Sequence, residues 1–494
     1  MKLRILERMS KTMNSNQNKV MSGLFWSFAE RISAQLVSTL VTIILARILE
    51  PSHYGVISIV TVFITFCNVF VSSGMGSAIV QKKEISEQDY NTAFFISIVI
   101  SVVLYTVLFI CSPYIASFYK MPELKSIIRV MSLRLPIAAI NSIQQARIRR
   151  EMMFKKFFIA TSLGTVISGV VGIILAYNGF GAWALVAQYL TNAIVDTGVL
   201  SIVQKWFPKL RFSIANARVI FSFGWKVLVT ELVYTLQGDI RSLIIGKVFG
   251  ASDLAFYDQG QKYPALFVNN INAALNKVML PTYSKNQDNI PKLKEMLRKT
   301  ISAGIFVLAP IMLGFAAIAD TFISVVLTDK WILCKPYIQI FCLYFLTRPL
   351  ETGCHQAILA IGRSDIALRI IIVINAYLLI VTLVSSFVFK SILMTAVGSL
   401  LSSLISLLCF MYYSRKLLDY RIKEQLEDIL PPVVCGVIMA IFVSRIGLSN
   451  TNEVLLLLIQ VTAGFFLYLI FALLMKINSL TYIFGLIKNI TDKH

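Results

Sequence analysis

The sequence predicts an all-α protein that crosses a membrane many times. Of its 494 residues, 57% are hydrophobic and only 14% are charged, whereas a soluble domain carries roughly 25% charged residues. The apolar runs are long enough for helical spans, which need about 20 residues, and they lack the alternation that is typical of strands. Because lipid offers the backbone no hydrogen bonds, such runs must satisfy their own polar groups. We therefore expect a polytopic helical membrane protein.

The apolar runs divide the chain into 14 expected transmembrane helices. The number falls to 12 or 13 if a weakly apolar run, such as 125–147 or 255–280, does not cross the membrane. The expected spans are 20–46, 55–80, 91–112, 125–147, 157–178, 181–204, 219–247, 255–280, 300–327, 336–361, 366–388, 392–414, 430–447 and 454–475.

Two internal echoes predict a duplicated architecture. The first span ends with the run Ala46-Arg47-Ile48-Leu49-Glu50-Pro51-Ser52-His53-Tyr54-Gly55. A similar run lies 200 residues later, at the end of the seventh span, and reads Gly246-Lys247-Val248-Phe249-Gly250-Ala251. Leu135-Pro136 is echoed by Arg348-Pro349. We expect two six-helix lobes in the same orientation plus two extra helices, because parallel repeats with a site between them are a known transporter plan. The expected parts are an N-terminal cytoplasmic segment 1–19, an N-lobe 20–204, a linker 205–218, a C-lobe 219–414, a linker 415–429, spans 13 and 14 at 430–475 and a tail 476–494.

The distribution of basic residues predicts the orientation. The formal net charge is +21, and 30 of the 46 Lys and Arg residues fall in the segments that are cytoplasmic if the N-terminus is inside. Cytoplasmic loops carry such an excess of Lys and Arg. Both termini are therefore expected in the cytoplasm, and the positive charge is attributed to membrane topology rather than to nucleic-acid binding.

Charged residues inside spans indicate a polar interior, because each is costly in hydrocarbon and normally faces other helices or a wet cavity. They are most frequent in spans 1, 4, 7, 8 and 10, and in the last four spans charged residues occur only near the ends. Arginine and lysine without matched partners would bind an anion, phosphate above all, because guanidinium offers forked donors. The alternative is that these charges pair and only lock helices together. The candidate anion-binding residues are Arg31, Arg134, Arg348, Lys226, Arg241 and Lys262.

Intramembrane carboxylates are candidates for coupling transport to an ion gradient, since an acid can bind a proton or sodium. The candidates are Asp258, Glu231, Asp239 and Asp320. The seven cysteines show no metal-ligand spacing, so no metal or cofactor is expected. Loops of at most about 20 residues leave no room for a soluble catalytic domain, so the chain is not expected to be an enzyme.

Several motifs together resemble polysaccharide flippases of the Wzx type, in the multidrug/oligosaccharidyl-lipid/polysaccharide exporter superfamily. These motifs are Gly23-Leu24-Phe25-Trp26-Ser27-Phe28, the run from Leu45 to Gly55, Gln81-Lys82-Lys83, Phe223-Gly224-Trp225, and Gly246-Lys247 with Tyr257. Within that family the sequence is similar to the branch that includes colanic acid and teichuronic acid exporters.

The resemblance implies two lobes around a cationic cavity, alternating access, and an undecaprenyl-pyrophosphate-linked oligosaccharide as substrate. It also implies a bacterial inner membrane location, a role in O-antigen, capsule or exopolysaccharide synthesis, and neighbours such as a polysaccharide polymerase. Coupling to H⁺ or Na⁺ stays open. So do two other functions, an ion-coupled multidrug extruder of the same superfamily and a membrane-embedded glycan polymerase or ligase. The excess of cations argues against the first, and the short outer loops argue against the second.

Overall fold

We analysed a computed structural model, which describes residues 33–82, 84–151, 153–209, 211–447, 452–477 and 480. The described residues are helices joined by short turns, and none of them forms a strand. This confirms the all-α prediction. The chain divides into two compact units, Met1–Ser252 and Asp253–His494, and each is described by itself.

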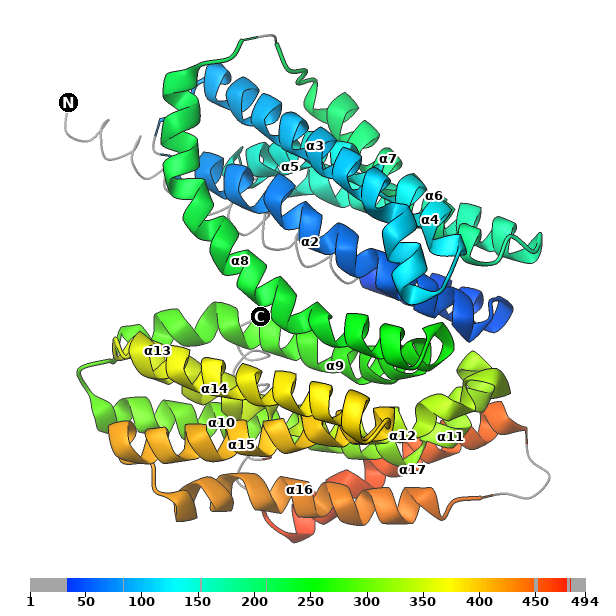
Figure 1. The fold of residues 1–494 in the computed structure, drawn as a ribbon. Coiled ribbons are helices and arrows are strands. Elements are labelled where there is room, and N and C mark those ends of the chain that lie inside the picture. The colour runs from blue at the N-terminus through cyan, green and yellow to red at the C-terminus, as the bar shows by residue number, and fades with distance from the viewer. Residues whose placement is uncertain are drawn as a thin grey trace. The chain divides into compact units, whose positions relative to one another are not determined.

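The first unit consists of long helices (Figure 1). They are Ser33–Ile48, α2 (Pro51–Gln81), α3 (Glu87–Tyr119), α4 (Glu123–Met131), α5 (Arg134–Glu151), α6 (Phe154–Tyr177), α7 (Ala182–Gln204) and α8 (Ile214–Val248).

The start of α2 explains the motif between Leu45 and Gly55. Pro51 occupies the first turn, where its missing N–H costs nothing and its fixed φ suits a helix. The Glu50 N–H donates to His53 Nδ1 over 3.3 Å, so the residue before the helix is also held. The motif is therefore a helix stop followed at once by a helix start.

α2 and α8 pack closely because each presents a glycine to the other. A Cβ placed on Gly74 would lie 2.9 Å from the Gly224 carbonyl oxygen, and one on Gly224 would lie 2.9 Å from the Gly74 oxygen. The backbones therefore touch directly. The expected repeat puts 219–247 in the second lobe, whereas in the structure α8 belongs to the same compact unit as α2.

The second unit begins at Asp253, within α9 (Ala251–Ser284). Leu297 and Ile301 of α10, Leu350 and Cys354 of α13 and Phe410 of α15 form the centre of its apolar core. Its remaining helices are α10 (Ile290–Ala317), α11 (Ala319–Phe322), a π-helical turn (Ile323–Leu327), a 3₁₀ segment (Asp329–Cys334), α12 (Lys335–Leu346), α13 (Arg348–Ala360), α14 (Ser364–Leu383), a second π-helical turn (Val384–Val388), α15 (Ile392–Leu418), α16 (Ile422–Ser444) and α17 (Glu453–Leu474).

Ten helices among the described residues are long and apolar enough to cross a membrane. They correspond to ten of the 14 expected spans. The other four expected spans lie at 20–46, 219–247, 255–280 and 336–361. The described residues of the first three are all helical, and the fourth is formed by α12 and α13. The last of them is interrupted at Thr347, between α12 and α13. A total of 14, and cytoplasmic termini, stay predictions.

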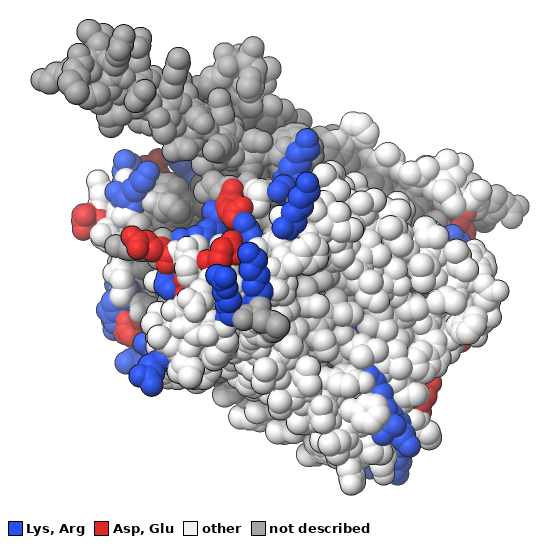
Figure 2. Space-filling model, turned by 90° about the horizontal axis from the view of Figure 1, so that it is seen from above, with Lys and Arg blue, Asp and Glu red and all other residues white. Residues whose placement is uncertain are grey.

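Surface charge is distributed as a membrane protein requires. Figure 2 shows charged side chains gathered mainly toward one end of the face in view, with few at the opposite end and a broad uncharged area between. Large apolar side chains such as Val99, Ile110 and Phe465 are about 60% exposed. In water such surface would be costly, whereas in a bilayer it faces lipid.

Candidate functional site

A polar pocket of about 520 Å³ lies within the first unit. Four helices of that unit, α2, α5, α7 and α8, supply its walls. Its polar lining residues are Thr65, Asn68, Ser72, Ser77, Arg134, Asn141, Ser142, Gln145, Arg149, Asn192, Asp196, Thr197 and Glu231. Arg134, Asn141, Gln145 and Arg149 follow one another at steps of seven, four and four residues, so they share one face of α5.

Arg134 stands where a membrane helix is interrupted. α4 ends at Met131 and α5 begins at Arg134. Pro136 has no N–H to donate to the carbonyl of Ser132, so a continuous helix would lose a hydrogen bond at this point. The interruption leaves Arg134 as the first residue of a half-helix, a position that lines the pocket.

The Arg134 guanidinium lies over the ring of Tyr189, with its carbon 5.1 Å from the ring centroid. Among the residues that the structure describes, Arg134 forms no ion pair. Contact with an aromatic ring stabilises the cation, and it leaves the N–H donors at the edge of the guanidinium available to an anion.

A row of side-chain hydrogen bonds follows the same face of α5 and ends at Asp196 on α7. Arg149 donates to Gln145 over 3.2 Å, Gln145 donates to Asn141 Oδ1 over 2.5 Å, and Asn141 Nδ2 donates to Asp196 Oδ2 over 2.9 Å. The Asn141 amide also donates to Thr197 Oγ1 over 2.9 Å. Every donor in the row points away from the Arg149 cation and toward the Asp196 carboxylate.

The second unit carries the echo of this arrangement at Arg348. Pro349 follows Arg348, and the helix is interrupted at Thr347. Arg348 Nη1 pairs with Glu351 Oε2 over 3.2 Å, and Glu351 Oε1 accepts from the Thr347 hydroxyl. Arg348 also donates to the Tyr344 hydroxyl. The expectation of an unmatched cation is therefore wrong for Arg348, because the residue three positions later on the same helix face neutralises it.

The other expected site residues are placed as follows. Lys226 and Lys262 are exposed, Asp239 and Asp258 are half-buried, and Arg241 is buried and has interaction partners. Asp320 is an exposed partner of Lys335, with 2.5 Å between carboxylate and ammonium. Within the described part of the first unit, the pocket brings together only two of the expected residues, Arg134 and Glu231. Arg31 lies outside the described residues.

Sequence reasoning missed Asn141, Gln145 and Arg149 as site residues, and it noted Asp196 only as an intramembrane charge. A signal was present, because Arg134, Asn141, Gln145 and Arg149 form a polar stripe at helical spacing. The stripe escaped notice because three of its four members are expected near the cytoplasmic end of the span, where polar residues are ordinary.

Comparison with known proteins identifies the family. Residues 44–336, more than half of the chain, match the family described as "Polysaccharide biosynthesis protein". The chain is 25% identical over 360 residues to the teichuronic acid biosynthesis protein TuaB of Bacillus subtilis, covering 72% of this chain and 74% of that protein. It is 22% identical over 357 residues to the lipopolysaccharide biosynthesis protein WzxC of Escherichia coli, covering 72% and 73% respectively.

Solved structures agree on the fold. An inward closed conformation of the lipid II flippase MurJ superposes with a TM-score of 0.72 at 13% identity, covering 92% of this chain and 98% of that chain. An inward-facing multidrug transporter of the MATE family gives a TM-score of 0.58 at 16% identity, covering 78% and 94%. The apolar helices and the bacterial relatives indicate a multi-pass protein of the bacterial inner membrane. The chain belongs to the polysaccharide biosynthesis protein family, and its fold is that of MurJ and the MATE transporters.

Proposed function

We propose that the protein is a flippase that moves an undecaprenyl-pyrophosphate-linked oligosaccharide from the cytoplasmic to the outer leaflet by alternating access. Family membership and the names of TuaB and WzxC support a role in polysaccharide biosynthesis, and a further relative, ExoT of Rhizobium meliloti, is named a succinoglycan biosynthesis transport protein. The observation that carries the proposal is Arg134, a cation without an ion-pair partner among the described residues that lines a polar pocket in a membrane-spanning unit.

The chemistry of the substrate requires such a group. A pyrophosphate carries two or more negative charges, and moving them unpaired through hydrocarbon is prohibitive. A guanidinium can replace part of the lost hydration with two parallel hydrogen bonds to phosphate oxygens. Amide and hydroxyl groups of the pocket, among them Asn68, Ser72 and Asn192, would accept and donate hydrogen bonds to sugar hydroxyls.

Transport also requires release, so no single site can bind too tightly. We infer that several cations share the phosphates during transport, among them Arg134 and, once its pair with Glu351 opens, Arg348. Arg31, Lys226, Arg241 and Lys262 remain proposed members of the same path. Asp258, Glu231, Asp239 and Asp320 remain proposed ion-coupling groups. Glu231 is the strongest of these four because it lines the same pocket as Arg134.

Two carboxylates in the pocket, Asp196 and Glu231, are the observation that favours a second candidate, an extruder of organic cations. Carboxylates attract organic cations, and Arg134 and Arg149 repel them. The two candidates therefore predict opposite charge preferences for the transported molecule.

Reconstitution into proteoliposomes distinguishes them. A fluorescent undecaprenyl-pyrophosphate oligosaccharide should cross the bilayer in the presence of the protein, measured as loss of protection from a membrane-impermeant quencher. Efflux of a fluorescent organic cation from the same vesicles should stay at the background rate. Cation efflux without glycolipid crossing would refute the flippase proposal. Collapse of the proton and sodium gradients in the same assay tests ion coupling separately.

A further inference from the structure

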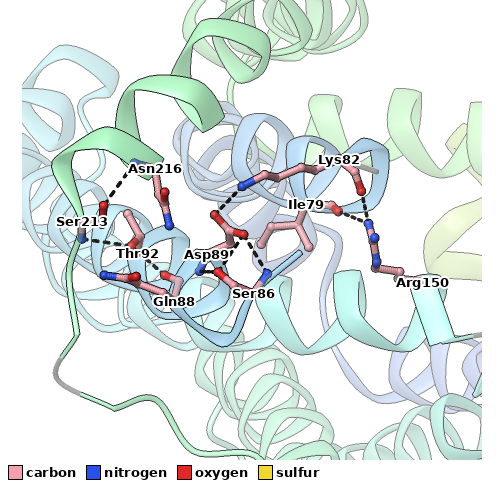
Figure 3. A network of polar contacts seen from close by, with 9 residues as sticks. All are labelled: Ile79, Lys82, Ser86, Gln88, Asp89, Thr92, Arg150, Ser213 and Asn216. Atoms are coloured by element: carbon pink, nitrogen blue, oxygen red, sulfur yellow. Dashed lines mark hydrogen bonds and ion pairs between the residues drawn. The ribbon is translucent and has the colours of Figure 1, made fainter. Parts of the chain in front are cut away.

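The linker between α7 and α8 folds against the first turns of α3. Trp206 Nε1 donates to Glu87 over 2.9 Å, and the Lys209 N–H donates to Asn91 Oδ1 over 2.8 Å. The Ser213 N–H donates to Thr92 Oγ1 over 3.2 Å (Figure 3). The linker is therefore held at its beginning, middle and end by side chains of one helix end.

This helix end is itself fixed. Asp89 forms an ion pair with Lys82 at 2.7 Å and accepts from the Ser86 N–H and hydroxyl. Arg150 donates to the carbonyl oxygens of Ile79 and Lys82 at the end of α2 (Figure 3). Trp206 is buried against the rings of Tyr90 and Phe94. The linker consequently rests on a rigid support.

Held in this way, the linker forms an apolar groove with α3. The groove has a volume of about 520 Å³ and almost no polar surface. Phe212 forms one wall, and it is 52% exposed, while Val99 on the opposite wall is 60% exposed. The groove is lined by Phe95, Ile96, Val99, Ile100 and Phe212.

Three cations stand on the same short linker, namely Lys205, Lys209 and Arg211. Their side chains are exposed, and within the described residues none of them forms an ion pair. The Glu87 carboxylate, which contacts the linker, accepts a hydrogen bond from Trp206 and pairs with Arg147 at 3.8 Å. An uncompensated basic patch therefore adjoins an apolar groove at the end of a membrane-spanning helix.

We propose that this groove and patch, built from Phe95, Ile96, Val99, Ile100, Lys209, Arg211 and Phe212, bind an anionic phospholipid of the surrounding bilayer. An acyl chain would lie along α3 beneath Phe212, and the phosphate would contact Lys209 and Arg211. Basic residues next to a membrane surface attract anionic lipid headgroups. The apolar groove also provides a binding site for the acyl chain, which a basic patch alone does not. The proposed occupant is a bulk phospholipid and not the transported glycolipid, because the groove shares no lining residue with the polar pocket that is proposed to bind the transported substrate.

The site has a consequence for transport. The backbone N–H groups of Lys209 and Ser213 donate hydrogen bonds to side chains of α3. A lipid bound to the linker side chains would therefore stabilise the contact between α3 and the start of α8. Membranes rich in anionic lipid would therefore favour the linker conformation that the structure shows.

Native mass spectrometry of the purified protein tests the proposal. We expect phosphatidylglycerol to remain bound under conditions that remove phosphatidylcholine of the same chain length. A Lys209→Gln/Arg211→Gln double variant should reduce this preference at least tenfold, at about fivefold per basic residue. The Lys416→Gln variant, which removes an exposed cation on α15, is the matched control and should keep the preference.

A Phe212→Ser variant tests the groove independently of charge. It should lower retention of long-chain phosphatidylglycerol while short-chain lipid is little affected, and thermal melting must show that each variant is folded. Equal retention of the two lipids by the wild type, or an unchanged preference in the double variant, would overturn the proposal. Displacement of phosphatidylglycerol by a lipid-linked oligosaccharide would also overturn it, because the groove would then belong to the transport substrate. None of these readouts depends on flippase activity.

Discussion

At the scale of single residues, Arg134 and Arg348 show what sequence can and cannot decide. Both were expected as cations inside spans. Pro136 follows Arg134 by two residues and Pro349 directly follows Arg348, and each helix is interrupted there. The partner of Arg348, Glu351, lies three residues away and was visible in the sequence. The surroundings of Arg134 depend on Tyr189, 55 positions later. Local spacing cannot predict such a contact, because it exists only after α5 and α7 have packed.

Removing the Arg134 guanidinium should impair transport. A hydrogen bond to a charged group contributes about 1.5–3 kcal/mol, so Arg134→Ala should slow glycolipid crossing in proteoliposomes by about tenfold to a hundredfold. Arg134→Lys should restore only part of the rate, because the forked geometry is lost. Lys416→Gln serves as the matched charge control. Crossing at the wild-type rate in folded Arg134→Ala protein would contradict the role of this residue.

The contact between Asn141 and Asp196 should contribute measurably to stability. Asn141→Leu removes a donor from a carboxylate inside the protein, and an unsatisfied buried group costs about 1–3 kcal/mol. Replacing both partners removes that penalty, so the Asn141→Leu/Asp196→Leu double variant should be more stable than the sum of the two single changes predicts. Thermal unfolding in detergent measures this coupling, and additive effects would mean that the two side chains do not interact.

At the scale of helices, the sequence predicted the spans better than it predicted where a span is interrupted or which helices are in contact. The start of α2 at Pro51, and that of α13 one residue before Pro349, follow from proline chemistry. The contact of α2 with α8 does not, because it depends on Gly74 meeting Gly224, 150 positions away in the chain. Each glycine alone is an ordinary helix residue. Only the fold shows that both must lack a side chain at the same place.

Alanine at either of these glycines should therefore destabilise the first unit. A Cβ 2.9 Å from a backbone oxygen forces the two helices apart, so Gly74→Ala and Gly224→Ala should each lower the melting temperature. Gly198→Ala on α7 is the matched control, because a Cβ there meets no atom within 4 Å. Alanine is a better helix former by up to about 1 kcal/mol, so the control should be neutral or stabilising. Equal melting of all three variants would contradict the close packing.

Tyr420, in the turn between α15 and α16, should make the protein lose thermal stability at alkaline pH. Tyr420 is fully buried. Burial is the main cause that raises the pKa of its phenol above the ordinary value, and the negative charge of the nearby Asp428 carboxylate raises it further. Its hydroxyl donates to Asp428 over 2.7 Å. A raised folded-state pKa gives stability that is present below pH about 10 and lost as pH rises further. Tyr420→Phe should therefore flatten the loss of thermal stability above pH 10, and an unchanged pH profile would exclude this contribution.

At the scale of the whole molecule, composition alone predicted a helical membrane protein, and most of the expected spans agree with the structure. The four expected spans outside the ten apolar helices are four of the five in which intramembrane charges are most frequent. The same residues that lower the hydropathy of these spans are the candidates for function. Hydropathy therefore predicts membrane spans least reliably in the helices that carry the candidate transport residues.

The orientation of the chain is open to a direct test, and the structure of the second unit sharpens it. Arg298 binds Asp428 through two hydrogen bonds of 2.7 and 3.0 Å, and Lys294 pairs with Glu424 at 2.7 Å. The start of α10 and the start of α16 therefore lie at the same end of the unit, so 281–299 and 415–429 must label from the same side. The Lys and Arg bias assigns that side to the cytoplasm.

In a variant without native cysteines, Lys292→Cys and Lys416→Cys should resist a membrane-impermeant maleimide in intact cells and react after permeabilisation. Asp329→Cys lies in the 3₁₀ segment that precedes α12, where the bias predicts the outer face, and it should react without permeabilisation. All three positions are exposed in the structure. Each cysteine should therefore react once the membrane is permeabilised, so that failure to react in intact cells reports the side of the membrane and not burial in the protein. Labelling of Lys292→Cys from outside, with protection of Asp329→Cys, would invert the orientation.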